Sequence, residues 1–167
     1  MFREMRRKKQ ALSSADCATI LQEGSSGVLA VAGDDGYPYA VPLSYLYTGG
    51  KLYFHGAKAG HKVEALKRNP KASFCVVAKD QVAPTEYTTR FQSVIAFGTV
   101  RMVEDEQEKR AAIEKLAIKY APKDSTANRE KYIAMGWARL CVMEMTIAHL
   151  SGKEAIEMTK ARQQKDQ

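Results

Sequence analysis

The stretch GVLAVAGDDGYPYAVPLSYLYTGGKLYFHG, from Gly27 to Gly56, decides how this chain folds. Apolar, β-branched and aromatic residues dominate it, and the sequences DDG and TGG that interrupt it are typical of tight turns. The pattern predicts three consecutive strands, at roughly Gly27–Ala32, Tyr37–Tyr47 and Lys51–His55. Because strands joined by tight turns pair antiparallel, the stretch predicts an antiparallel sheet.

The rest of the chain adds more strands and several helices. Capping residues and apolar helical spacing predict helices at Ser13–Gln22, between Gly60 and Pro70, between Asp105 and Pro122, and at Asn128–Met135. Further strands are predicted at Ala72–Ala78, at Thr88–Asp105 with a bend or bulge at Gly98, and from Leu140 to Ile147. We therefore expect a mainly β protein with peripheral helices, in which six antiparallel strands close into a barrel.

Length and composition indicate one globular domain over residues 1–167, because 45% of the residues are apolar and 27% are charged. The net charge of +7 is concentrated in residues 1–10, where five basic residues against one acidic residue give +4. We describe residues 1–10 as a basic N-terminal arm and residues 156–167 as a polar C-terminal tail. The arm could be solvated, contact a polyanion or pair with a partner subunit, and we expect no nucleic-acid binding.

No apolar run approaches the ~20 residues of a membrane helix, and no secretory signal follows the basic start. We expect a cytoplasmic protein without membrane association. The three cysteines, Cys17, Cys75 and Cys141, lie far apart in apolar surroundings, which is typical of buried reduced thiols. We expect no metal site, because the one close pair of candidate ligands, His55 and His61, has no cysteine nearby.

The helix that starts after Gly60 is the best candidate for a binding site. A helix start exposes unpaired N–H groups and a partial positive charge, which attract anions and above all phosphate. His61 and Lys62 fall in this first turn, where cations are unfavourable unless an anion lies between them. The alternative is that both are solvated residues of an ordinary strand-to-helix connection.

The end of the preceding strand could form the other part of the site. Gly56 would allow a ligand to approach the backbone closely, and backbone amides around Ala57 could contact a flat polar ring. Tyr45 is the aromatic residue that we expect to face such a ligand. His55 has a simpler interpretation as a polar residue at the rim of the sheet. GxSxG, GxGxxG, P-loop and HExxH motifs do not occur in the sequence.

Several separated segments together resemble the flavin mononucleotide (FMN)-binding split-barrel superfamily of pyridoxamine 5′-phosphate oxidase, and within it the 5-nitroimidazole resistance (Nim) branch. The segments are MRRK at Met5–Lys8, VPLSYLY at Val41–Tyr47, YFHGAKAGHK at Tyr53–Lys62, NP at Asn69–Pro70, FQSVIAFGTVRMV at Phe91–Val103 and LSGKEA at Leu150–Ala155. The resemblance rests on their order and spacing, and it covers about residues 5–155.

The resemblance implies a six-stranded antiparallel split β-barrel that forms a homodimer with FMN at the subunit interface. The residues implied to bind FMN are Val41, Pro42, Leu43, Ser44, Tyr45, His55, Gly56, Ala57, His61, Lys62, Gln92 and Ser93. Of these, the run from Val41 to Ser44 would lie along the flavin ring, and His61 and Lys62 would bind the phosphate. Gln92 and Ser93 would reach the flavin from the partner subunit.

The sequence departs from the oxidase pattern in two places. His61 replaces the arginine of the phosphate-binding turn, which weakens the positive charge there at neutral pH. The residues that hold the pyridoxal ligand near the C-terminus are not recognisable, so we do not predict a role in pyridoxine biosynthesis.

The function implied is that of an FMN-dependent oxidoreductase that reduces a small flat acceptor such as a nitroaromatic. His55 would be the catalytic residue, as a proton donor or an electrostatic stabiliser. The alternative is a flavin- or haem-binding split-barrel module without catalysis.

Overall fold

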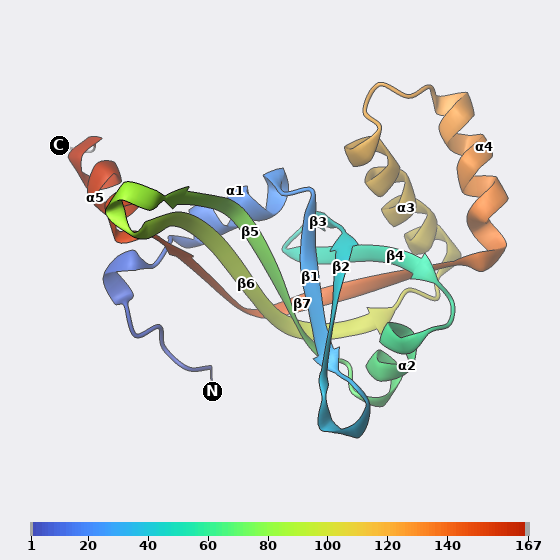
Figure 1. Ribbon diagram of the computed structural model, residues 1–167. Helices are drawn as coiled ribbons and strands as arrows, with labels where there is room; N and C mark the ends of the chain where they lie inside the picture. The colour runs from blue at the N-terminus through green and yellow to red at the C-terminus, as the bar shows by residue number, and fades with distance from the viewer. Residues whose placement is uncertain (1, 166–167) are drawn as a thin grey trace.

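The computed structural model describes residues 2–165, which fold around one sheet of seven antiparallel strands (Figure 1). The strands are β1 (Ser26–Ala32), β2 (Pro38–Ser44), β3 (Leu46–Thr48), β4 (Lys51–Ala57), β5 (Lys71–Ala83), β6 (Thr88–Met102) and β7 (Leu140–Glu154). The helices are α1 (Ser14–Glu23), α2 (His61–Arg68), α3 (Glu106–Tyr120), α4 (Thr126–Gly136) and α5 (Ile156–Lys165). The order across the sheet is β2-β1-β5-β6-β7-β4-β3. The predicted class, mainly β with peripheral helices, is confirmed.

The strand number is seven rather than the predicted six, because the segment predicted as one strand at Tyr37–Tyr47 forms two. β2 pairs with β1 and β3 pairs with β4, so the chain passes from one edge of the sheet to the other at Tyr45. The N–H of Tyr45 donates to Tyr120 Oη over 2.8 Å, and its carbonyl accepts from Lys119 Nζ over 3.0 Å. The edges of the curled sheet thus meet at Tyr45 without closing into a continuous hydrogen-bonded barrel.

The main core lies on the inner face of the curled sheet. Leu29, Phe54 and Phe74 are fully buried there, and the rings of Phe54 and Phe74 lie 4.9 Å apart. α1 covers this core with Cys17 and Leu21, and it begins at Ser13 with a capping box, as its capping residues predict. Burial of these side chains supplies most of the stabilisation, at about 25 cal/mol per Å² of apolar surface.

Helices α3 and α4 form a hairpin at one end of the sheet, and α5 lies at the other end (Figure 1). The predicted apolar stripe of α3 is confirmed for Ala112, Ile113 and Leu116, which are buried in a second core cluster with Val142 of β7. Tyr120, at the end of the stripe, is 42% exposed and its hydroxyl lies at the Tyr45 backbone. The second cluster holds the hairpin against the sheet, and it places the last turn of α3 beside the β2–β3 junction.

Strands β5 and β6 form a hairpin that is longer than predicted. The sequence indicates a strand only to Ala78, whereas β5 continues to Ala83. The extension was missed because residues 79–82 are exposed and therefore show no alternation of buried and exposed positions. The bulge predicted at Gly98 is confirmed by a register shift against β7, where a Cβ would clash with the Thr146 carbonyl. This hairpin projects toward the end of the molecule that carries α5 (Figure 1).

The chain ends run close to the sheet. In the N-terminal arm, Gln10 is buried and donates to the Glu154 carbonyl over 2.8 Å, and the Phe2 ring stacks on His149. Residues 156–165 of the C-terminal tail form α5, in which Arg162 binds Asp16 and Glu154. Within residues 2–165, no helix is long and apolar enough to span a membrane.

The three cysteine thiols are free. Cys17 is buried as predicted, whereas Cys75 and Cys141 are half-buried. Burial raises the pKa of each thiol, which keeps it protonated and weakly reactive at neutral pH.

Candidate functional site

The predicted ligand-binding residues of β2, β4 and α2 lie where these three elements come together, whereas Gln92 and Ser93 lie elsewhere. Ser44 of β2 and His55 of β4 border the same cavity. His61 of α2 stacks on Tyr39 of β2, with ring centroids 4.0 Å apart. Sheet curling thus brings together residues as far apart in the sequence as Tyr39 and His61.

β2 is an edge strand whose side chains alternate between the core and the surface. Val41 and Leu43 pack against the main core, whereas Pro42 and Ser44 are exposed. Backbone groups on the outer side of an edge strand have no ladder partner. The run from Val41 to Ser44 can therefore present its backbone and two of its side chains to a ligand.

The start of α2 has the geometry of an anion site, with one acidic neighbour. Gly60 precedes the helix with φ = +124°, no side chain caps the first turn, and a Cβ on Gly60 would meet nothing within 4 Å. His61 lies with Nε2 3.4 Å from Asp34 Oδ2, and Arg68 pairs with the other oxygen of the same carboxylate. An incoming anion would compete with Asp34 for His61.

Gly56 makes room for Lys62. A Cβ built on Gly56 would lie 3.3 Å from Lys62 Nζ, so the lysine side chain folds back across the end of β4. Burial, together with the nearby charge of Lys62, lowers the pKa of His55. Although His55 is exposed, this shift favours its neutral imidazole form.

A cavity of about 810 Å³ lies between the end of the sheet and the α3–α4 hairpin. Ser44 and His55 border it on the sheet side. Its helical walls are mostly apolar, with Ile113, Leu116 and Ile133 among the lining residues. The sequence pattern identified the stripe of α3 but gave no sign that the hairpin forms the wall of a site.

Tyr45 does not face this surface, so the expectation that its ring would face a ligand is wrong. The side chain is fully buried, with its ring 4.9 Å from that of Phe74. Its backbone N–H and carbonyl are already bonded to Tyr120 and Lys119. The aromatic pattern could not reveal this, because the β2–β3 junction turns the tyrosine into the core.

Gln92 and Ser93 lie far from the other predicted residues within one chain. Ser93 pairs with Lys153 of β7, whereas His55 pairs with Val142 of the same strand. These two β7 positions are eleven residue steps apart, which span roughly 35 Å at ~3.3 Å per step. Gln92 and Ser93 can therefore join this site only from a second copy of the chain.

The arrangement of strands and helices matches a known family. Residues 13–154 match the family described as pyridoxamine 5′-phosphate oxidase. The chain belongs to the pyridoxamine 5′-phosphate oxidase family. Its fold is the split barrel, with an open rather than a closed sheet.

Three known proteins are similar to this chain. A solved candidate 5-nitroimidazole antibiotic resistance protein of Bacteroides thetaiotaomicron is 23% identical, with 86% of each chain covered and a TM-score of 0.75. A solved FAD-binding protein of Mesorhizobium loti is 25% identical, with 87% of this chain and 97% of that chain covered and a TM-score of 0.64. An uncharacterised protein of Rhizobium meliloti is 29% identical over 89 residues, and the match spans about half of its length (54%) and 53% of this chain.

Proposed function

We propose that this chain is a flavin-dependent oxidoreductase that binds FMN and reduces a small flat acceptor such as a nitroaromatic. The observation that carries the proposal is the meeting of three features: the uncapped start of α2, the exposed edge of β2, and the apolar cavity beside His55. A phosphate, a flat polar ring and a second flat molecule would each find a suitable surface there.

The residues present fit the two parts of FMN. The first turn of α2 offers N–H groups and open space at Gly60 for the phosphate. Lys62 can swing from Gly56 to that anion, because only the flexible end of its side chain makes the contact. The exposed Pro42 and Ser44 and the outer backbone of β2 form a flat edge for the ring.

His55 is the side chain placed to act on the acceptor. A neutral imidazole donates one hydrogen bond and accepts another, so at neutral pH His55 can hold an acceptor oxygen in position. It becomes a proton donor as the pH falls through its lowered pKa. When bound, the flavin supplies the electrons or hydride for the reduction.

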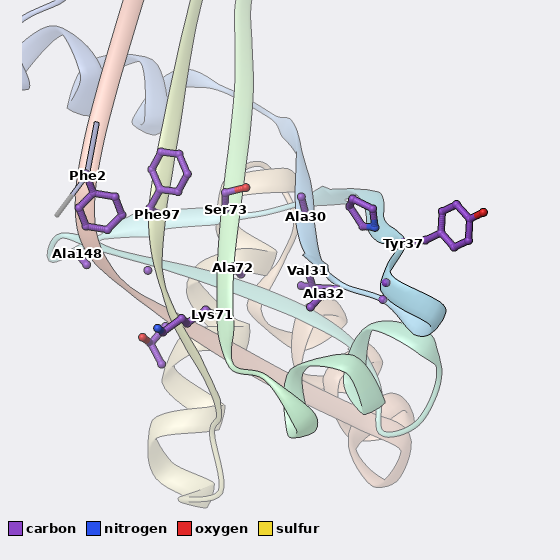
Figure 2. Close-up of a pocket in the computed structure, with 15 residues that line it drawn as sticks. Phe2, Ala30, Val31, Ala32, Tyr37, Lys71, Ala72, Ser73, Phe97 and Ala148 are labelled. Atoms are coloured by element: carbon purple, nitrogen blue, oxygen red, sulfur yellow. The ribbon is translucent and has the colours of Figure 1, made fainter. Parts of the chain in front are cut away.

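A homodimer is part of the proposal, because Gln92 and Ser93 lie too far away to act on the site of their own chain. The outer face of the sheet offers a surface for a second copy. Val28 of β1 and Ile95 of β6 point outward there and are 39% and 36% exposed. Both pair with Cys75 of β5, which lies between them in the sheet. On the same face, a hollow of about 740 Å³ is bordered by Phe2, Ala30 and Phe97 (Figure 2).

The absorbance of the purified protein tests the cofactor. We expect a flavin spectrum and the release of FMN on heat denaturation, identified by chromatography and mass. Release of FAD, the cofactor in the name of the Mesorhizobium loti relative, would correct the cofactor and leave the oxidoreductase proposal in place. A Soret band, or no bound chromophore, would contradict the proposed cofactor.

Anaerobic mixing tests the reaction. The reduced protein is mixed with a nitroaromatic, and the return of the oxidised flavin spectrum is followed. We expect reoxidation that depends on the nitroaromatic concentration. If a panel of flat acceptors leaves the flavin reduced, the chain is a flavin-binding module without this activity.

A further inference from the structure

Arg129 of α4 stands out among the residues that line the cavity beside His55. We infer that Arg129 is a specificity determinant and that the cavity takes a flat aromatic molecule carrying a carboxylate. This inference rests on the proposed function for the chemistry at His55, and it adds the chemical class of the molecule that enters.

The guanidinium of Arg129 lacks the partner that a half-buried charge ordinarily has. Its Nε is buried without a hydrogen bond, and its Nη2 makes only a 3.3 Å contact with the Thr126 hydroxyl. Within residues 2–164, no carboxylate lies within 4 Å of it. A buried donor without a partner costs about 1–3 kcal/mol, and more when charged, so this site favours an incoming acceptor.

The nearby acidic groups already have hydrogen-bond donors. Asp124, which also borders the cavity, accepts from Asn128 Nδ2 over 2.9 Å and from the Ser125 N–H over 2.9 Å. Arg110 of α3 pairs with Glu130. Arg129 is thus the cation of the described cavity lining that has no acidic partner, whereas the carboxylate of Asp124 already has hydrogen-bond donors.

The remaining walls suit the aromatic part of the ligand. Ile113, Leu116 and Ile133 provide apolar contacts, and about 810 Å³ is ample for a single substituted ring. His55 lies on the sheet wall and Arg129 on the helical wall, so both ends of a flat molecule can be held. A planar guanidinium donates two parallel hydrogen bonds to the two oxygens of a carboxylate. A neutral amide has only one acceptor oxygen and cannot accept this pair of bonds.

Calorimetric titration of the purified protein with 4-nitrobenzoate and 4-nitrobenzamide tests this inference. The two molecules have the same shape and differ in the charge of one group. We expect the carboxylate to bind about tenfold or more tightly than the amide. Equal binding, or no binding of the carboxylate, would overturn the inference.

Two variants assign the preference to one residue. Arg129→Gln removes the guanidinium, and we expect it to abolish the preference for the carboxylate. Lys131→Gln removes the same charge from an exposed position of the same helix, outside the cavity lining, and we expect it to retain the preference. Loss of the preference in both variants would point to long-range charge instead of Arg129.

The outcomes for this inference and for the proposed function are separable. Binding is measured without turnover, so a colourless protein that prefers the carboxylate would contradict the proposed function alone. A flavoprotein that binds both molecules equally would contradict the inference alone. Should Arg129→Gln fail to fold, as judged by its thermal melt, the comparison of the two ligands on the unmodified protein still decides.

Discussion

At the scale of single residues, the two histidines near the site differ in surroundings and therefore in chemistry. His61 stacks on Tyr39, and its Nε2 lies 3.4 Å from the Asp34 carboxylate at the exposed start of α2. His55 borders the apolar cavity beside Lys62, where burial and the like charge favour the neutral form. Their spacing in the sequence suggested a pair, but they serve separate parts of the candidate site.

Replacing His55 with Gln tests its role in turnover. We expect a drop in turnover of about a hundredfold, because Gln cannot supply a proton or the same hydrogen bond. In the unmodified protein the rate should rise as the pH falls through a value below the ordinary 6.5, since protonation turns His55 into an acid. The variant should lose this dependence.

Flavin content is the control for His55→Gln. The variant should retain the same amount of bound flavin, because the phosphate and ring surfaces lie on α2 and β2. Unchanged turnover together with an unchanged pH profile would remove His55 from the mechanism.

At the scale of elements, a buried carboxylate joins three neighbouring strands, β4, β6 and β7. Glu144 of β7 is 1% exposed and accepts from Lys51 (3.0 Å) and Tyr53 (2.9 Å) of β4 and from Arg101 of β6 (3.0 Å). Burial alone would raise the pKa of Glu144, but these hydrogen bonds outweigh it and hold the pKa at about 2. The cluster fixes β4, and with it His55, relative to the rest of the sheet.

Replacing Glu144 with Gln should destabilise the protein by about 3 kcal/mol at neutral pH, because two basic groups lose their shared partner. The pKa is lower in the folded than in the unfolded state, so the carboxylate stabilises the fold above pH 4.5 and loses this effect as the pH falls toward about 2. Urea unfolding at a series of pH values would measure both effects.

The exposed Glu104, replaced with Gln, is the matched control for Glu144. The free energy of unfolding of the Glu104→Gln variant should stay within about 0.5 kcal/mol of that of the unmodified protein. If Glu144→Gln and Glu104→Gln showed the same pH dependence, the cluster would not be the source of the acid sensitivity.

At the scale of the whole molecule, the proposed second copy on the outer face of the sheet would bring Gln92 and Ser93 to the site of its partner. Val28, Ile95 and Val77 leave apolar surface exposed on adjacent strands, although buried core lies directly behind them. A flat apolar face of this kind usually marks an interface between proteins. A second copy placed on it would also cover the hollow beside Phe2 and Phe97.

Replacing Ile95 with Lys tests the dimer. We expect the unmodified protein to have twice the 18.6 kDa chain mass in light scattering, and the variant to be monomeric with less bound flavin. A charge in the centre of the apolar face would lose its water without gaining a partner. Met135→Lys, a change at a 64% exposed position of α4, should leave the dimer intact. A monomeric unmodified protein at micromolar concentration would contradict the proposal.

The sequence by itself indicated most of the strands and helices, and it supplied the candidate residues of the site. Apolar, β-branched and aromatic residues between turn sequences identified the strands from Gly27 to His55. Apolar spacing identified the stripe of α3, and the glycine pattern located the start of α2. Each of these signals is local, because periodicity reports which face of a segment is buried. The order of the same segments also indicated the family.

Only the tertiary structure decided which distant groups meet. It broke the predicted second strand at Tyr45, where Lys119 and Tyr120 take over its backbone hydrogen bonds. In the folded protein, Arg129 lies in the wall of the cavity beside His55, and Gln92 lies at the far end of the sheet. Periodicity cannot predict these features, because it contains no information on which residue far along the chain satisfies a backbone group or faces a cavity.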